Sequence, residues 1–364
     1  MTALTGRTRV FSRSDLILIG VAVLSTVGAA VVTSGTLLPF LVSATAVAVL
    51  AALVGRAVDH LADKLGAGAV GVLQSALGNL PELFIAFFAL RAGLVQVVQA
   101  AIIGSMLANL LLVLGAAFLV GGLKHGKQKF AKSRARDTVV LLSLATAALV
   151  VPSVAKYTHT PAEAHVDRLS DIVAVVLLVI FALSLPAAIK RNAHTDSGSA
   201  EEPAPEVEHA PTRWPLWVAV TLLAGASVAA AFVSDWFVKA LTPAMAALHI
   251  SPTFAGLVVV AIAGNAIENV VGIQLSWKNQ ADYALAVIVN SPLQIALVLA
   301  PALVLLSLFT ATTLTLVFAP LLVVAVVVSV LLVALAVFDG ESSWLEGATL
   351  IGLYVIIAAA FWWG

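Results

Sequence analysis

The sequence contains no cysteine and very little charge. The absence of cysteine excludes disulfide bonds, cysteine nucleophiles, Cys-ligated zinc and iron–sulfur clusters. Charged residues make up only 10% of the 364 residues, against about 25% in a typical soluble domain. The formal net charge of zero gives no sign of nucleic acid or an acidic partner. So little charge cannot cover the water-exposed surface of a soluble protein of this size.

What is present is a long succession of apolar segments. Hydrophobic residues make up 61% of the sequence, and the mean hydropathy is +1.08. Since a membrane-spanning helix needs about 20 mainly apolar residues, we predict an all-α, integral, multi-pass membrane protein with eleven transmembrane helices. The expected spans are roughly residues 15–34, 36–54, 66–91, 95–122, 137–155, 168–189, 213–239, 248–277, 281–308, 311–337 and 344–363.

The basic residues predict how these spans are oriented. If the N-terminus is cytoplasmic, with Arg7, Arg9 and Arg13 ahead of the first span, fifteen of the 19 Lys and Arg residues fall on the cytoplasmic side. This bias supports an odd number of spans and an outer C-terminus, in a plasma or inner membrane. All seven tryptophans lie near predicted span ends, where an aromatic belt is expected.

Two segments repeat one pattern at an offset of 186 residues. Residues 78–82 read GNLPE and residues 264–268 read GNAIE, and Ser105 and Ser291 each follow the glutamate of their segment by 23 residues. The offset corresponds to five predicted spans, an odd number, so the two copies would run through the bilayer in opposite directions. Such inverted repeats, with an ion site near the midplane, are typical of secondary transporters.

The repeat divides the chain into four expected regions. They are an N-terminal flank with an extra first helix, a first five-helix repeat, a linker and a second, inverted five-helix repeat, at residues 1–35, 36–190, 191–212 and 213–364. The linker is rich in Pro, Ala and Glu, so we expect an acidic, hydrophilic segment on the cytoplasmic side. The repeated motifs occupy residues 78–122 of the first repeat and residues 264–301 of the second.

Glu82 and Glu268 are the only acidic residues that we expect in the interior of a span. A charged side chain at the bilayer centre costs about 2.5–3.5 kcal/mol on insertion scales, and a bound cation shared by both carboxylates would offset that cost. The alternative is that each glutamate is protonated and hydrogen-bonded to its neighbours, or reaches to the membrane surface. The matching positions of the pair favour a cation site.

Neutral polar groups surround the two glutamates in the same four spans. Hard cations such as calcium take six to eight oxygen ligands, and the candidates here are Asn79, Asn265, Ser105, Ser291, Asn109 and Gln294. The alternative role for each is an interhelical hydrogen bond. Gly78, Gly264 and Pro81 are expected to break the helices beside the glutamates. Gly104 and Gly115 are expected to permit close helix contact.

Positions 78–122 look like the first alpha-repeat of the calcium/proton exchangers, and positions 264–301 resemble the second. That family belongs to the cation/calcium antiporter superfamily. The resemblance implies that Glu82 and Glu268 bind calcium and protons in turn, that the six neutral candidates line the pathway, and that no cofactor is needed. The sequence departs from the family pattern at Asn269, where members often carry His, and the LPE of the first motif is similar to that of sodium/calcium exchangers.

The expected function is therefore secondary antiport of calcium against protons. A sodium-coupled or broader cation exchanger and a passive cation channel stay open as alternatives. We expect no enzymatic activity, because the sequence has no HExxH, P-loop or GxSxG motif. The expected partners are the transported cation and the lipid bilayer, without nucleic acid, and assembly into a homo-oligomer is left open.

Overall fold

The computed structural model describes residues 10–65, 77–195 and 214–363, with the backbone alone for residues 62–65, 185–195 and 267–268. This part of the chain is almost entirely helical. Six helical segments in it are long and apolar enough to cross a membrane, and two further helices that meet at a 62° bend pass the same test together. The expected all-α membrane architecture is confirmed at this level.

The described elements of the first half begin with two long helices. In chain order they are α1 (Arg13–Val31), α2 (Leu37–Leu65), α4 (Leu80–Arg91), α5 (Val95–Leu107), the π-helical segment η1 (Ala108–Val113), α6 (Leu114–His125), strand β1 (Gln128–Lys129), α7 (Lys132–Tyr157), the 3-10 turn η2 (Pro161–His165) and α8 (Val166–Thr195). A capping box starts α1, because Ser12 and Asp15 each accept a hydrogen bond from the other's backbone N–H.

The second half contains more interruptions. Its elements are α9 (Leu216–Leu248), α10 (Pro252–Phe254), the π-helical segment η3 (Ala255–Val260), α11 (Ala261–Gly264), α12 (Ala266–Trp277), α13 (Ala281–Gln294), the π-helical segment η4 (Ile295–Leu299), α14 (Ala300–Ser307), α15 (Pro320–Ala336), strand β2 (Glu341–Ser342) and α16 (Trp344–Ala360). Segments of π-helix are rare and occur often at functional sites.

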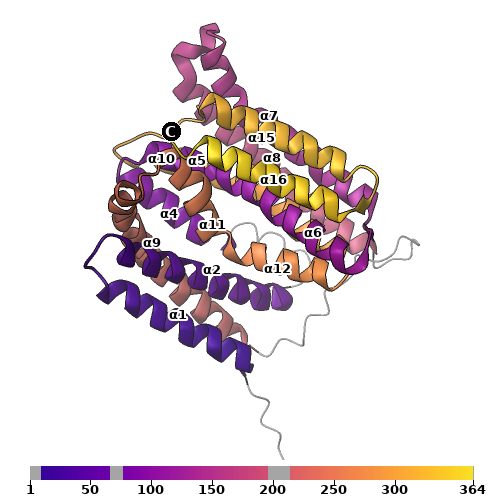
Figure 1. Cartoon of the computed structure of the whole chain (residues 1–364), viewed down its shortest axis with the longest axis horizontal. Helices are drawn as coiled ribbons and strands as arrows, with labels where there is room; N and C mark the ends of the chain where they lie inside the picture. Colours follow the sequence, from indigo (N-terminus) through magenta and orange to yellow (C-terminus); the bar gives the residue numbers. More distant parts are fainter. Residues whose placement is uncertain (1–9, 66–76, 196–213, 364) are drawn as a thin grey trace, which may run out of the picture.

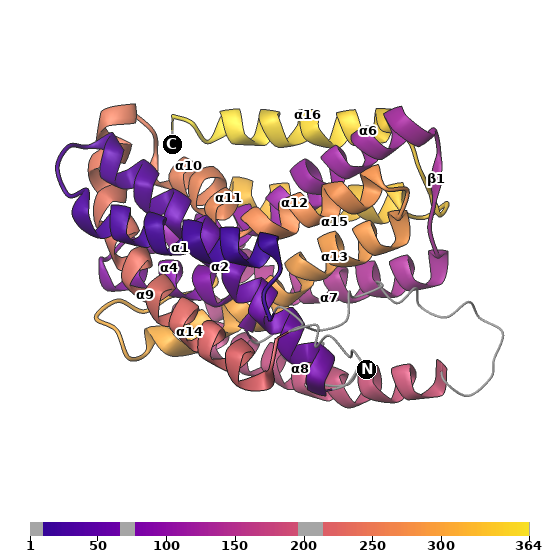
Figure 2. The ribbon, with the colours of Figure 1, turned by 90° about the horizontal axis from the view of Figure 1, so that it is seen from below.

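The helices form a bundle in which segments far apart in the sequence lie side by side (Figures 1 and 2). On one side, α2 packs against α1 and α9, whereas α7 packs against α8 and α15 on the opposite side. Between these groups lie the shorter helices α4, α5, α12 and α13. The two segments that carry the sequence motifs are therefore in the middle of the bundle.

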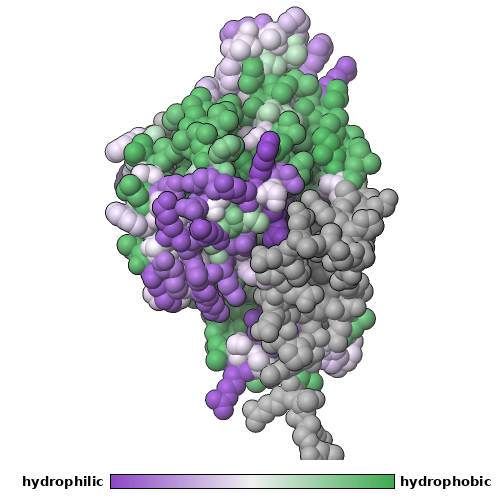
Figure 3. All heavy atoms as spheres, turned by 90° about the vertical axis from the view of Figure 1, so that its right-hand side faces the viewer, coloured by the Kyte–Doolittle hydropathy of each residue, from purple (hydrophilic) through white to green (hydrophobic). Residues whose placement is uncertain are grey.

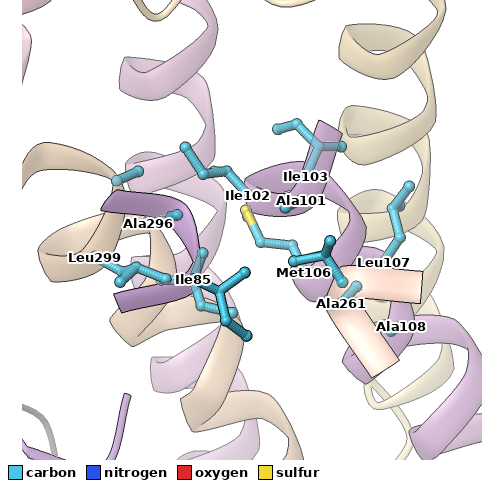
Figure 4. Close-up of a cluster of buried hydrophobic side chains, with 14 of the residues drawn as sticks. Ile85, Ala101, Ile102, Ile103, Met106, Leu107, Ala108, Ala261, Ala296 and Leu299 are labelled. Carbon is cyan, nitrogen blue, oxygen red and sulfur yellow. The ribbon is translucent and has the colours of Figure 1, made fainter. Parts of the chain in front are cut away.

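The core between these central helices is tightly packed and apolar. Figure 4 shows Ile85 of α4 and Met106 of α5 among buried residues of α11 and η4. Gly104 of α5 lies against the backbone of Leu257 in η3, and a Cβ at this glycine would overlap that backbone. Gly115 of α6 likewise lies against α16, so the predicted close helix contacts at Gly104 and Gly115 are confirmed.

One predicted span is wrong over its first part. We expected a helix from residue 311, but α15 begins at Pro320 and the preceding segment is not helical. Proline fits the first turn of a helix and biases the residue before it towards extended conformations. Side-chain hydroxyls replace the missing helical hydrogen bonds: Ser153 Oγ donates to Leu316 O and accepts from Phe318 N, and Ser170 Oγ accepts from Leu316 N.

A short two-stranded sheet joins two loops at one end of the bundle. Strand β1, after α6, pairs antiparallel with β2, before α16. Lys127 Nζ lies 3.1 Å and Lys129 Nζ 3.8 Å from carboxylate oxygens of Glu341. Figure 3 looks onto this end of the molecule and shows hydrophilic residues gathered in a patch with hydrophobic residues beside it.

Candidate functional site

Helices α4 and α12 begin in nearly the same way. Asn79 and Asn265 are the residues that precede the two helices, and their backbone angles are φ −92° and ψ 15° at Asn79 and φ −95° and ψ 20° at Asn265. Each helix carries the glutamate of its motif, Glu82 or Glu268, as its third residue. The predicted helix breaks beside both glutamates are therefore confirmed.

Five polar side chains from both motifs form one hydrogen-bonded network in the middle of the bundle. Asn265 Nδ2 donates to Ser105 Oγ at 2.9 Å, and Asn109 Nδ2 donates to Asn265 Oδ1 at 3.0 Å. Asn109 Nδ2 also donates to Ser291 Oγ at 3.2 Å. Ser105 Oγ in turn donates to Glu82 Oε1 at 3.3 Å. Each of the five side chains is at most 7% exposed, so the two motifs share one buried polar centre.

Two further predicted residues meet beside this network. Asn79 Nδ2, from the start of α4, donates to Gln294 Oε1 at the end of α13 over 3.4 Å. Gln294 is one helical turn after Ser291, so this pair extends the polar centre along α13.

Oxygen atoms in this centre suit a hard cation. Asn109 is fully buried, and within the described residues nothing donates a hydrogen bond to its Oδ1. An amide oxygen without a donor can accept a cation instead. The Glu82 carboxylate, which accepts from Ser105 of the same network, can supply negative charge. The groups present therefore fit a cation ligated by carboxylate and amide oxygens.

Gly264 fixes where the carboxylate of Glu82 can lie. A Cβ built on Gly264 would be 2.5 Å from Glu82 Cγ, closer than real Cβ atoms approach other atoms, and 3.1 Å from Oε1, a tight contact. The glycine of the second motif therefore makes room for the glutamate of the first. This contact gives Gly264 a packing role in addition to the helix break.

The second predicted glutamate is described only by its backbone. Glu268 lies in the first turn of α12, and its side chain falls outside the described residues. The structure thus brings together seven of the eight residues predicted from the sequence. Their role as ion ligands stays a prediction, as does the convergence of the two carboxylates.

A cavity of about 470 Å³ extends from this polar centre, and we call it the vestibule. Its lining includes Asn79, Ser291 and Gln294 from the centre, and Gly264, against which Glu82 packs. Farther out, α2 and α13 contribute the polar lining residues Arg56, Asp59 and Asn290. The vestibule can admit water and small ions to the buried centre.

We did not single out Arg56 or Asp59 as site residues from the sequence. Arg56 is one of the fifteen basic residues that the orientation argument places on the cytoplasmic side. The spacing of Arg56 and Asp59 in the sequence could have indicated that they lie together, because residues three apart on a helix share one face. The π-helical segments η1 and η4, which follow Ser105 and Gln294, have no comparable sequence signature.

Comparison with known proteins agrees with this architecture. The sequence model of the family described as sodium/calcium exchanger protein matches residues 35–190 and 217–363. A Ca(2+)/H(+) antiporter of Aphanothece halophytica is 35% identical over 332 residues, covering 88% of this chain and 89% of the relative. The Ca(2+)/H(+) antiporter ChaA of Bacillus subtilis is 36% identical over 324 residues, covering 88% of this chain and 91% of the relative.

A solved structure is similar over nearly the whole length. The crystal structure of the selenium-substituted Ca2+/H+ antiporter protein YfkE matches with a TM-score of 0.80 and 33% sequence identity, covering 96% of this chain and 99% of that one. The family match includes both motif segments and leaves out the segment 191–216 that contains the predicted linker. The chain therefore belongs to the sodium/calcium exchanger protein family.

Proposed function

We propose that this chain is a secondary antiporter that exchanges calcium for protons across a membrane. The observation that carries the proposal is the hydrogen-bonded network, in which Asn265 and Ser291 of the second motif contact Ser105 and Asn109 of the first. The names of the relatives, which are calcium/proton antiporters at 35–36% identity, agree with this function.

Element boundaries support two repeats of five helices after an extra first helix, eleven spans in all. Helix α12 begins and ends 186 residues after α4, and α13 begins 186 residues after α5. A π-helical segment follows both α5 and α13. Each of these elements thus has a counterpart at the offset of the sequence repeat, as an inverted repeat requires.

The proposed mechanism is competition between calcium and protons for Glu82 and Glu268. Calcium binds when both carboxylates are ionised, because its two positive charges balance theirs. Protons neutralise the carboxylates when calcium leaves, since an uncompensated charge in a buried site is costly. The site is near-neutral with either calcium or protons bound, so both loaded states can reorient across the membrane. The empty site carries two negative charges and resists reorientation, which prevents uncoupled transport of either ion.

The vestibule then gives the site access from one side. Arg56 and Asp59 lie in the second half of α2, the end that the distribution of basic residues places on the cytoplasmic side. With a cytoplasmic N-terminus, the vestibule connects the polar centre to the cytoplasm. Cytoplasmic calcium enters through it and is expelled by the proton gradient.

Reconstituted protein is expected to accumulate calcium in liposomes when a pH gradient, acidic inside, is imposed. Calcium added outside should in turn release protons from the liposomes. Competition further predicts that the apparent KM for calcium rises as the pH on the uptake side falls. Radioactive calcium uptake and an entrapped pH dye measure these effects, with empty liposomes as the control.

Replacing the pH gradient by a sodium gradient separates the rival functions. Calcium accumulation driven by sodium alone would identify a sodium-coupled exchanger. Calcium flux that dissipates a calcium gradient but never builds one would identify a passive channel. Either result would contradict calcium/proton antiport.

A further inference from the structure

The guanidinium of Arg56 lies in the wall of the vestibule, along the route proposed for the cation. Arg56 of α2 lines the vestibule, and its side chain is 45% exposed. Coulomb repulsion acts twice as strongly on a divalent ion as on a monovalent one. An uncompensated positive charge at this position would therefore oppose calcium entry.

Asp15 of α1 supplies a counter-charge to this guanidinium. Arg56 Nε and Nη2 donate to Asp15 Oδ1 at 3.1 and 2.9 Å. The Asp15 side chain is only 3% exposed. Charge-assisted hydrogen bonds of this kind are stronger than those between neutral groups.

The other carboxylate oxygen of Asp15 holds the pair in place. Asp15 Oδ2 accepts hydrogen bonds from Trp214 Nε1 at 3.1 Å and from the backbone N–H of Ser12 at 2.9 Å. Trp214 is 1% exposed and stacks on His60 of α2, with ring centroids 4.2 Å apart. Trp214 lies two residues before α9, at a span end as expected, but its ring is buried against other side chains and is not exposed.

We propose that Asp15 is an electrostatic positioning residue for calcium entry, a role that rests on the proposed function. It neutralises the Arg56 guanidinium and holds it in the vestibule wall, so that calcium reaches the polar centre without passing an unpaired positive charge. The proposal gives α1, which lies outside the two repeats, a part in transport. Among the described residues, the hydrogen bonds of Asp15 go to Ser12, Arg56 and Trp214 and not to the hydrogen-bonded network, so the link from Asp15 to the vestibule runs through Arg56.

Asp15→Asn tests this role by removing the charge with little change of shape. The Asn Oδ1 can still accept from Trp214 and Ser12, whereas the Asn Nδ2 then faces the Arg56 donors and cannot accept from them, so the guanidinium loses both its counter-charge and its acceptor. We expect the KM for calcium to rise about tenfold at an ionic strength of about 0.01 M, where charges interact over about 30 Å. At about 1 M, where that range falls to about 3 Å, the KM should return to near the wild-type value. The maximal rate should change little.

A second substitution separates the charge from a structural role. Asp15→Asn combined with Arg56→Gln removes both charges of the pair, leaves the other vestibule residues such as Asp59 unchanged, and should restore the wild-type KM. Asp235→Asn breaks the pair with Lys239 on α9, an ion pair of 2.6 Å that does not line the vestibule, and should leave the KM unchanged. If Asp15→Asn does not fold, Arg56→Gln alone should lower the KM, because it leaves an additional negative charge.

The outcomes distinguish this inference from the proposed function. A wild-type protein without proton-driven calcium uptake would overturn the proposed function itself. Normal wild-type uptake together with an unchanged KM in Asp15→Asn would overturn the inference alone. The inference would also be overturned if Asp15→Asn raised the KM for calcium and neither high salt nor the additional Arg56→Gln reversed this rise. A higher KM in Arg56→Gln alone would overturn it as well.

Discussion

Glu82→Gln is expected to abolish proton-driven calcium uptake, lowering the initial rate by at least about 100-fold. The glutamine keeps the shape of the side chain and an oxygen that can accept from Ser105 Oγ. It cannot provide the negative charge that balances calcium or exchange a proton in its place. Removing one partner of a buried charged pair costs about 3–5 kcal/mol, which corresponds to a factor of more than 100 in binding.

The control for this variant is a glutamate outside the site. Glu163 lies in η2, is 41% exposed and pairs with His159 at 2.9 Å, so Glu163→Gln should leave uptake unchanged. Thermal unfolding in detergent checks that both variants are folded. Wild-type rates of proton-driven accumulation in Glu82→Gln would refute the proposed mechanism.

Gly264→Val is expected to reduce uptake almost as strongly, although it replaces none of the polar residues of the site. The new Cβ would collide with Glu82 Cγ and Oε1. Overpacking of this kind forces side chains out of their preferred rotamers, and here the displaced group is the carboxylate itself. We expect a fall in calcium affinity of at least about tenfold, because a small misplacement of a ligand is costly in a preformed site. Calcium titration of the purified variant measures this effect.

Gly225 of α9 provides a matched glycine for comparison. Nothing lies within 4 Å of a Cβ built there, so Gly225→Val makes the same chemical change in open surroundings. It should retain calcium affinity and uptake. If Gly264→Val also bound calcium with wild-type affinity, the position of Glu82 would not depend on the glycine of the second motif.

The site composition could be predicted from the sequence because each half carries its own copy of the motif. The spacing between Glu82 and Ser105 recurs between Glu268 and Ser291, and such a coincidence inside apolar spans indicates a shared function. The structure places seven of the eight predicted residues in or beside one hydrogen-bonded centre. The breaks beside Asn79 and Asn265 were also predictable, from glycine and proline in the motifs.

Other features depend on tertiary contacts that the hydropathy of the sequence does not show. The segment before Pro320 is as apolar as a helix, yet its backbone is satisfied by Ser153 and Ser170 from distant helices. The contact between Asp15 and Trp214 joins residues that are 199 positions apart. Hydropathy measures only whether a segment is apolar, so it could not distinguish these cases from an ordinary span or a tryptophan at the membrane surface.

The most direct test of the account is a structure of the protein determined with bound calcium, in which anomalous scattering locates the ion. A shared site for calcium and protons requires one calcium ion in the polar centre, with carboxylate oxygens of both Glu82 and Glu268 at about 2.3–2.6 Å. Calcium bound by only one of the two glutamates, or a Glu268 side chain that points into lipid, would contradict it.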